Sequence, residues 1–468
     1  MYQPRELHRF PPEVAHDALG CRARAPHTFT ILAGLAALLA VLELGRLVIF
    51  AAYPVPPPAW SVAPWSPFMT RHACTTAYWS AATTIEQTPD VFSLAASSAG
   101  RDPATGRPLP RQIGPFFVDP YEYPPTFLLV PRAIAVVAPE FATFRHVWLL
   151  LNAALVIASM VAIARRVDAG TGSRSLWLLP LAIVPLTTMY ALQMGNAQLV
   201  FVVLAAVALL AFERGRHALG GLLLAYAIVG KLFPALLLVY LAIRREWRAV
   251  GWTAAWAVVL TIVTIADIGW APFPAFFDHL PRLLSGEAFP MLRAPVTPPN
   301  SQSIPGLVLK LPSLGGPEVP FVSLKIAGWI YSAVILWATV RLALRPLAPR
   351  VAPLAWLVVL GLAALRSPFI PSYGAFPGAW IAAILLAVCW NDARRWWWIF
   401  GLWLTLVPTT AGPAPIPLGV ISVFTTIQTV AVLALMAIAV RVGREAHDGL
   451  PSPVAVRGPA TVTAAIGA

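Results

Sequence analysis

Two acidic residues lie among aromatic residues and prolines in the segment Asp119-Pro-Tyr-Glu122-Tyr-Pro-Pro125, directly before an apolar run. A carboxylate in apolar surroundings has a raised pKa, which suits it to act as a general base toward a hydroxyl group. The alternative is structural, with Asp119 capping a turn and Glu122 exposed to solvent. We take Asp119 and Glu122 as the candidate catalytic residues.

Side-chain amides gather in two short polar stretches, at residues 193–198 and 300–306. The first is a tight turn between two apolar runs, and the second is a turn-forming stretch late in a long loop. An amide in such a place can hydrogen-bond a polar ligand or tie two helices together, and residue type alone leaves both interpretations open. The candidate substrate-binding amides are Asn196, Gln198, Asn300 and Gln302.

Two cationic residues stand at breaks in the apolar pattern. Lys231 separates two apolar segments, and a lysine within membrane depth suggests a function because burying its charge is costly. Arg366 ends another apolar run. Both side chains can instead extend to lipid headgroups. We predict that Lys231 and Arg366 bind a lipid phosphate, whereas His279 beside Asp278 favours a local structural pair.

The composition indicates that these residues belong to a membrane protein. The chain has 468 residues, of which 58% are hydrophobic and 11% are charged, and its mean hydropathy is +0.73. Soluble domains carry about a quarter charged residues, so an apolar surface of this extent needs the bilayer as its solvent. The net charge of +13 comes largely from Arg in short breaks between apolar runs, which indicates membrane topology and not nucleic-acid binding.

The sequence lacks the motifs of several well-known classes of enzyme. The chain contains no Walker A motif, Gly-rich dinucleotide fingerprint, HExxH or GxSxG, so we expect no nucleotide-driven mechanism. Its three cysteines, Cys21, Cys74 and Cys389, are far apart, which implies neither a disulfide framework nor a metal cluster. We therefore expect no cofactor and no clear requirement for a metal ion.

The apolar runs predict about 12 transmembrane helices. They lie near 29–53, 142–165, 175–193, 196–213, 216–230, 232–244, 248–270, 321–344, 351–366, 373–391, 394–412 and 418–441. The runs at 216–230 and 232–244 are shorter than the roughly 20 residues that cross a bilayer, so they are predicted to be short, tilted or re-entrant. A run at 124–139 contains prolines and an arginine, and is predicted to be re-entrant or interfacial. The expected fold class is an all-α polytopic membrane protein.

The distribution of Arg predicts the orientation of the chain. With both termini in the cytoplasm, nearly every Arg cluster lies on the cytoplasmic side, as the positive-inside rule requires. Two long outer loops then cover about 54–123 and 271–320, and loops of this length are usually functional. Residues 1–28 are a cytoplasmic segment, 29–441 a single transmembrane domain, and 442–468 a disordered cytoplasmic tail.

A series of short motifs resembles glycosyltransferase family 87, part of the GT-C superfamily of polytopic enzymes. They are Ala77-Tyr78-Trp79-Ser80-Ala81-Ala82, Tyr123-Pro124-Pro125, Gly195-Asn196-Ala197-Gln198, Gly220-Gly221 running on to Lys231-Leu-Phe-Pro234, the stretch 300–306, and Ser367-Pro368. Together they cover roughly residues 70–390. The resemblance implies a GT-C-like bundle with its active site at the outer face, and it implies that Tyr78, Trp79 and Tyr123 bind substrate beside the four amides.

The resemblance also implies a reaction. A sugar, mannose in the best-known members, would move from a polyprenyl-phosphate carrier to a lipid or glycan acceptor, with inversion and with a carboxylate as base. The partners would be the donor, the acceptor and membrane lipids, with no nucleic acid, and the location would be the plasma (inner) membrane. The family commonly has an Asp, thought to be the base, four residues before the first Tyr, where this chain has Cys74.

Two other functional classes fit part of the pattern. A transporter or flippase for lipid-linked substrates would place its polar residues at the bilayer midplane with access from both sides. Here they gather on one predicted side beside two long loops, which favours an enzyme. A non-catalytic member of the same fold is favoured by Cys74 at the position of the usual Asp.

Overall fold

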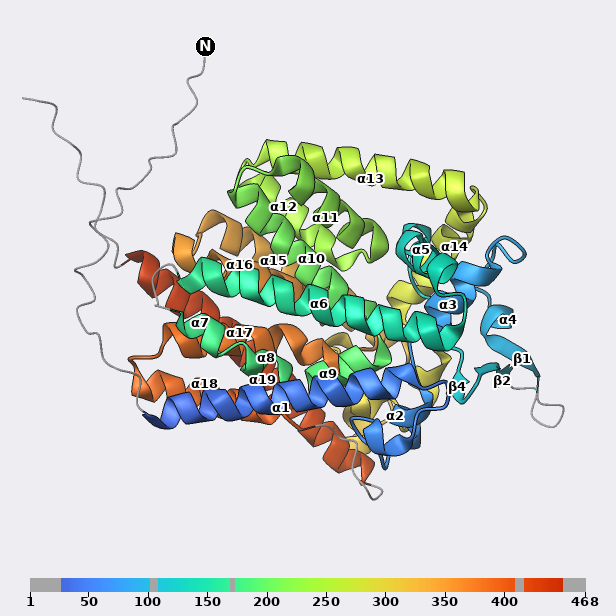
Figure 1. Ribbon diagram of the computed structural model, residues 1–468, viewed down its shortest axis with the longest axis horizontal. Coiled ribbons are helices and arrows are strands. Elements are labelled where there is room, and N and C mark those ends of the chain that lie inside the picture. The colour runs from blue at the N-terminus through green and yellow to red at the C-terminus, as the bar shows by residue number, and fades with distance from the viewer. Residues whose placement is uncertain (1–26, 102–107, 169–172, 409–415, 449–468) are drawn as a thin grey trace, which may run out of the picture.

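The fold of the chain is a bundle of helices (Figure 1). A computed structural model describes residues 27–101, 108–168, 173–408 and 416–448. Helices make up 74% of it, which confirms the predicted all-α class. Most of the predicted N-terminal segment and the predicted tail beyond residue 448 lie outside the described residues.

Within the described residues, five helices are long and apolar enough to cross a bilayer: α1 (His27–Ala52), α6 (Phe141–Asp168), α13 (Trp247–Ile268), α15 (Val322–Leu344) and α19 (Leu418–Asp448). A sixth candidate is the pair α9 (Leu186–Met194) and α10 (Ala197–Glu213), which is bent by 107°. The other predicted spans are shorter helices: α11 (His217–Gly230), η3 (Phe233–Ala235) with α12 (Leu236–Ile243), η7 (Pro349–Val351) with α16 (Ala352–Ala364), η8 (Ser372–Ala375) with α17 (Phe376–Val388), and α18 (Ala393–Leu406).

Most of the predicted apolar runs coincide with helices to within a few residues, and two differences stand out. The run 175–193 is broken into α7 (Arg174–Trp177), α8 (Pro180–Ile183) and α9, because Pro180 and Pro185 remove backbone donors that a continuous helix needs. Helix α19 continues to Asp448, seven residues beyond the predicted end of the transmembrane domain at 441. The run 124–139 forms η2 (Pro125–Leu128) and α5 (Leu129–Val137), a short helix as predicted.

The core of the bundle is built on helices that are apolar on all sides. Helices α10, α16 and α17 are buried over nearly their whole length, as expected for helices without a polar face. Helix α11 packs between α10 and α13 through two glycines, because a Cβ atom on Gly221 would lie 2.7 Å from the backbone of Trp252 and one on Gly220 would lie 2.6 Å from Phe212. The Gly220-Gly221 motif therefore serves close helix packing.

The two predicted outer loops are folded segments. The first holds η1 (Pro58–Trp60), α2 (Pro67–Arg71), α3 (Thr75–Thr84), α4 (Leu94–Ser97) and two small antiparallel hairpins, β1 (Ser98–Arg101) with β2 (Pro108–Pro110) and β3 (Gln112–Ile113) with β4 (Phe116–Phe117). The second holds α14 (Pro272–Ser285), η4 (Pro290–Arg293), η5 (Pro298–Asn300) and η6 (Pro305–Leu314). In Figure 1, helices α3, α5 and α14 and the hairpins gather at the right-hand end of the molecule, here called the loop-covered end.

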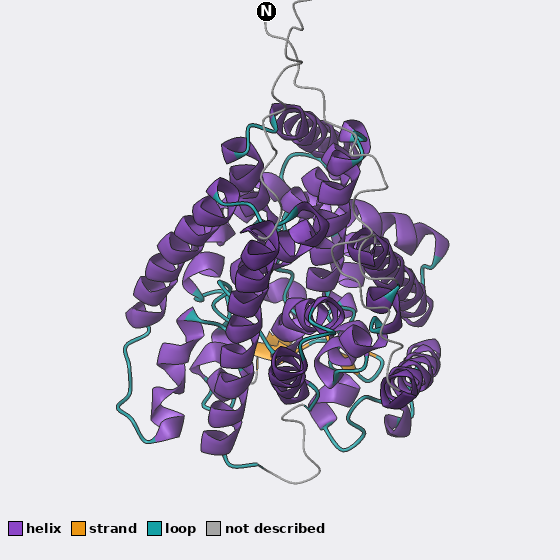
Figure 2. Cartoon of the chain, turned by 90° about the vertical axis from the view of Figure 1, so that its left-hand side faces the viewer, coloured by secondary structure: helices purple, strands orange, loops and turns teal. Residues whose placement is uncertain are grey.

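At the opposite end of the bundle, several connections between helices carry Arg residues. Arg166 pairs with Glu213 at 2.8 Å and donates to the carbonyl of Pro349, while Arg395 pairs with Glu445 at 2.5 Å. The first two contacts hold the ends of α6 and α10 beside η7, and the third holds the start of α18 beside the end of α19. Figure 2 looks onto this Arg-rich end and shows several helices along their axes. The positive-inside rule predicts that this end faces the cytoplasm.

Candidate active site

Two segments of the first loop run side by side at the loop-covered end. A β-bridge joins His72 to Phe117. The hydroxyl of Thr76 donates to the carbonyl of Ala73 at 2.7 Å and accepts from the backbone N–H of Asp119 at 3.1 Å. This local pairing fixes the residues around Cys74 against those around Asp119, although more than forty positions separate them in the sequence.

The first carboxylate of the site is paired with a histidine. Asp119 Oδ1 lies 3.1 Å from His72 Nδ1, and the other ring nitrogen of His72 lies 4.0 Å from Cys74 Sγ. Burial lowers the pKa of His72, but the carboxylate of Asp119 and the hydrogen bonds to Asp119 and Cys74 outweigh it and raise that pKa to about 10. The histidine thus carries a proton in this arrangement, and Asp119 is held in an ion pair.

The second carboxylate has its own histidine from the second loop. Glu122 Oε2 lies 2.7 Å from Nε2 of His279, whose ring stacks on Phe92 with centroids 5.4 Å apart. The expected local pair of His279 with Asp278 is thus replaced by a long-range pair. Burial raises the pKa of Glu122 above its ordinary value, while His279, Arg282 and Lys231 act in the opposite direction. A raised pKa makes Glu122 a stronger proton acceptor than an exposed glutamate.

An aromatic wall lies beside the two pairs. The hydroxyls of Tyr78 and Tyr123 are 2.9 Å apart, and the backbone N–H of Ala197 donates to Tyr78 at 3.1 Å. Lys231 Nζ lies 4.9 Å from the centroid of the Tyr123 ring, within cation–π range. The break between α11 and η3 therefore brings the predicted phosphate-binding lysine to the predicted substrate-binding tyrosines and next to Glu122.

The tight turn between α9 and α10 closes the site on another side. Gly195 ends α9 with φ +65°, and its carbonyl accepts a hydrogen bond from the Trp148 indole at 2.9 Å. Asn196 caps α10 by accepting from the backbone of Gln198 at 2.9 Å, and its amide nitrogen faces Cys74 Sγ at 3.5 Å. The Gln198 amide nitrogen is buried and has no partner among the described residues.

Other predicted site residues have structural partners. Trp79 donates to the carbonyl of Pro139 at 2.9 Å and contacts the Phe141 ring, on elements that do not carry the acid–histidine pairs. Gln193, from the same polar stretch as Asn196, ties the first loop to α9 through Ser61, Val62 and Met69. The amides of this stretch thus include both structural and site-facing members.

The second polar stretch lies in a separate neighbourhood. Asn300 donates to the carbonyl of Val296 at 2.9 Å. Gln302 is fully buried and donates to Gln428 on α19 at 2.9 Å, while Arg366 donates to Ser332 on α15 at 2.7 Å. These hydrogen bonds tie Asn300 to its own loop, Gln302 to α19 and Arg366 to α15.

A pair of tyrosines also lies near the first acid–histidine pair. The rings of Tyr190 and Tyr373 lie 5.8 Å apart, and both are within electrostatic range of Cys74 and Asp119. Sequence reasoning missed these tyrosines and the two histidines, because each partner lies far away in the chain. Histidines in the long loops were the available signal, but pairing was assigned only to neighbours in sequence.

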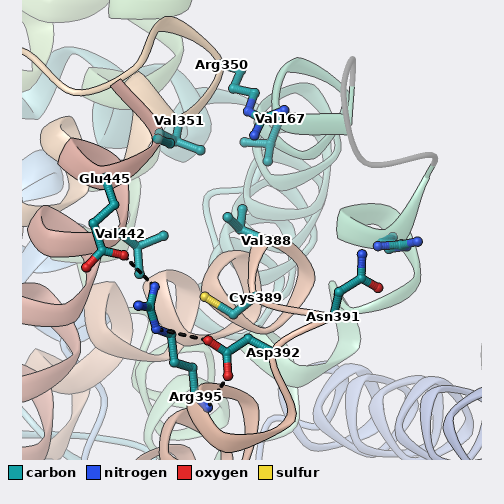
Figure 3. A pocket seen from close by; sticks show the side chains of 12 residues that line it. Val167, Arg350, Val351, Val388, Cys389, Asn391, Asp392, Arg395, Val442 and Glu445 are labelled. Carbon is teal, nitrogen blue, oxygen red and sulfur yellow. Dashed lines mark hydrogen bonds and ion pairs between the residues drawn. The ribbon is translucent and has the colours of Figure 1, made fainter. Parts of the chain in front are cut away.

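A cavity of about 370 Å³ lies at the Arg-rich end, away from the site (Figure 3). Its polar lining includes Arg350, Asn391, Asp392 and Arg395 together with Glu445, and Arg395 bridges the two acids. None of the sequence-predicted site residues lines this cavity. The candidate site is therefore defined by the acid–histidine pairs and the residues around them, and not by this cavity.

Comparison with known proteins supplies the family. No curated protein matches the chain. Among solved structures, it is similar to ArnT from Cupriavidus metallidurans in the apo state, with 16% identity, coverage of 88% of this chain and 78% of that chain, and a TM-score of 0.31. This TM-score is too low to transfer any feature of that enzyme.

The model of glycosyltransferase family 87 matches residues 121–368, which is more than half of the 468 residues. The matched range includes Glu122, Tyr123, Lys231 and His279, and it confirms the resemblance found in the sequence motifs. The chain therefore belongs to glycosyltransferase family 87 and is a membrane glycosyltransferase.

Proposed function

We propose that the protein transfers a sugar, mannose by family resemblance, from a polyprenyl-phosphate carrier to a hydroxyl of a lipid or glycan acceptor. The reaction takes place at the loop-covered end, which lies on the extracytoplasmic face of the plasma (inner) membrane, with both termini in the cytoplasm. The observation that carries the proposal is the meeting of Glu122, Tyr123 and Lys231 at this end, because it joins a base, a binding wall and a phosphate-binding cation.

Glu122 is the proposed base. Its carboxylate takes the proton from the acceptor hydroxyl while the hydroxyl oxygen forms a bond to the anomeric carbon. The bond from that carbon to the phosphate oxygen breaks, and its electron pair leaves with the polyprenyl phosphate. One displacement of this kind inverts the anomeric centre. Burial of Glu122 supports the assignment, because a raised pKa favours proton acceptance near neutral pH.

The leaving phosphate gains negative charge, and Lys231 is the proposed group that stabilises it. A cation placed where charge develops contributes more in the transition state than in the ground state. His279 holds the Glu122 carboxylate in place at 2.7 Å. The amide nitrogen of Gln198, for which the described part of the chain offers no partner, and the capping residue Asn196 supply polar contacts for the sugar. Asp119, which is paired with His72, has no step of its own in this scheme.

The test is sugar transfer by the purified full-length protein in detergent. Radiolabelled polyprenyl-phosphate mannose is supplied with a membrane lipid extract, and labelled lipid products are separated and counted. We expect a labelled product whose anomeric configuration is opposite to that of the donor. Polyprenyl-phosphate glucose and a nucleotide-linked mannose are the matched alternative donors.

Each outcome bears on a separate part of the proposal. Transfer from the glucose carrier alone would overturn the assignment of mannose but leave the reaction class. Transfer from the nucleotide sugar alone would overturn the lipid-linked donor. A complete lack of transfer from every donor, by protein that remains folded and monodisperse, would favour the non-catalytic alternative and overturn the proposal.

A further inference from the structure

His72, Cys74 and Asp119 form a compact group of three different metal-binding side chains. One ligand atom from each lies within 4.8 Å of the ligand atoms of the other two. In a tetrahedral zinc site the donor atoms are about 3.3–3.7 Å apart, as follows from zinc–nitrogen, zinc–oxygen and zinc–sulfur bond lengths. Closing the group around an ion therefore requires shifts of about 1 Å and a rotation of the imidazole ring that directs one of its nitrogens at the ion.

We propose that His72, Cys74 and Asp119 bind a divalent transition-metal ion of the zinc class, with a fourth position left for an exchangeable oxygen. A nitrogen, a thiolate sulfur and a carboxylate oxygen suit zinc better than magnesium or calcium, which prefer oxygen ligands alone. Binding would release the proton of the thiol and a proton of the imidazole. The charges of the thiolate and the carboxylate would then balance the ion.

The surrounding residues are arranged as outer partners of such a site. Asn196 must present its side-chain oxygen to the backbone of Gln198, since that contact caps α10, and its amide N–H group is therefore the one that faces Cys74 Sγ at 3.5 Å. An N–H group directed at sulfur stabilises a thiolate. The backbone N–H of Cys74 donates to the carbonyl of Met194 at 2.8 Å, so the same turn fixes the cysteine.

The segment that carries Asp119 is also fixed by hydrogen bonds. The hydroxyl of Thr76 accepts from the backbone of Asp119 at 3.1 Å, and the β-bridge from His72 to Phe117 fixes the spacing of the two segments. The three ligands therefore stand on a preformed frame rather than on independent loops. All three also precede residue 121, where the family match begins, so the family model supplies none of them.

The fourth coordination position would give the metal site a role in sugar transfer, and this role rests on the proposed function. Phosphate oxygens are ligands for zinc-class ions. The ion would share the negative charge of the carrier phosphate with Lys231, while Glu122 stays free to accept the proton. Metal binding itself requires neither donor nor acceptor, so it can be measured whether or not transfer occurs.

The experiment uses the full-length protein in detergent, treated with a chelator and then titrated with Co²⁺ alone. We expect one equivalent to bind, with a thiolate-to-cobalt charge-transfer band and the visible spectrum of a four-coordinate ion. Cys74→Ala should abolish the charge-transfer band. Cys389→Ala is the matched control, because that thiol lies in the cavity at the other end and should leave the band unchanged.

Affinity for Zn²⁺, measured by competition against bound Co²⁺, separates ligands from neighbours. His72→Ala and Asp119→Ala should weaken binding by more than about 100-fold, which exceeds the range for loss of an outer partner. Asn196→Ser keeps a helix-capping hydroxyl but loses the N–H···S contact, and it should weaken binding by about 10–100-fold. Circular dichroism and size-exclusion profiles verify that each variant is folded.

Two results would overturn the inference. One is a wild-type protein that binds no Co²⁺ and contains no stoichiometric zinc when purified without chelator. The other is a charge-transfer band that survives Cys74→Ala, which would place the thiolate ligand elsewhere. A protein that binds metal as expected but transfers no sugar would retain the metal site and refute the proposed function instead.

Discussion

The carboxylates of the candidate site are held by histidines, whereas those at the Arg-rich end are held by arginines. Asp119 and Glu122 contact imidazole nitrogens at 3.1 and 2.7 Å, while Glu445 is shared by Arg395 and Arg441 at 2.5 and 2.9 Å. A guanidinium group is charged at every accessible pH, so its ion pairs serve structure and topology. An imidazole can carry a charge or be neutral, and its ring nitrogens can donate or accept a proton, so its pairs can serve chemistry.

Burial sharpens the difference between the two ends. The side chains of Glu122 and His279 are 15% and 8% exposed, against 41% and 78% for Glu445 and Arg441. Exposed ion pairs contribute little to stability because water screens them. The desolvated pair is therefore the one whose removal should alter function, and the predictions below test this contrast.

The largest effect is expected from Glu122→Gln, which keeps the shape of the side chain but removes the base. Loss of a general base slows a reaction by about 10²–10⁴-fold, so the rate of sugar transfer should fall within this range. Glu445→Gln at the Arg-rich end is the matched control and should leave the rate unchanged. Equal losses in the two variants would show that the contrast between the ends has no functional meaning.

Lys231→Met should have the next largest effect. Removing one group that stabilises developing charge costs about 10²–10³-fold in the rate constant for transfer at saturating donor. Lys231→Arg retains the positive charge and should recover part of the rate. Arg350→Met removes a cation from the cavity at the other end and should not change it. A loss confined to donor affinity, with full rate at saturation, would limit Lys231 to ground-state binding.

Glycine substitutions compare the packing of the two ends. Gly195 and Gly215 both have positive φ, at +65° and +72°, so alanine costs about 1–2 kcal/mol at either position. A Cβ atom on Gly195 would lie 2.5 Å from Thr75. One on Gly215 would have no described atom within 4 Å apart from those of its chain neighbours. Gly195→Ala should therefore lose a further 1–3 kcal/mol, roughly, from overpacking.

The unfolding temperature in detergent, followed by Trp fluorescence, measures this difference. Gly195→Ala should unfold at a clearly lower temperature than Gly215→Ala. Equal unfolding temperatures would mean that the turn at Gly195 is free to move away from Thr75, and that the frame of the site is looser than its contacts indicate.

The pH dependence of the transfer rate should reflect the protonation of Glu122. Its basic form is lost as the pH falls through its pKa, and burial raises that pKa above the ordinary value. The rate should thus begin to fall at a higher pH than for an exposed glutamate, by about tenfold for each further pH unit. His279→Gln removes a group that lowers the pKa, so it should move this acidic limb to still higher pH.

The smallest effect is expected from Trp79→Phe. The indole donates one hydrogen bond, to the carbonyl of Pro139, and its loss should cost about 1 kcal/mol of stability while leaving transfer intact. Tyr78→Phe is the comparison, because it removes the hydroxyl that joins Tyr123 to the backbone of Ala197. A slower rate in Trp79→Phe would support the assignment of Trp79 to substrate binding.

The sequence by itself determined the class of protein and most of its helices. Long apolar runs have one stable form in a bilayer, because a helix satisfies every backbone hydrogen bond internally. The run 175–193 was predicted as one helix and is broken, although Pro180 and Pro185 were visible in it. The order of the short motifs was also sufficient to identify the family, which the match over residues 121–368 confirms.

Tertiary structure alone decided which polar residues meet. Asp119 and Glu122 are three positions apart, but one pairs with His72 and the other with His279, 157 positions away from Glu122. Periodicity and hydropathy describe residues that are close in the sequence. An ion pair depends on how two loops that are distant in the sequence pack together. The positions of Gln302 and Arg366 have the same cause, because contacts with Gln428 on α19 and Ser332 on α15 hold these side chains.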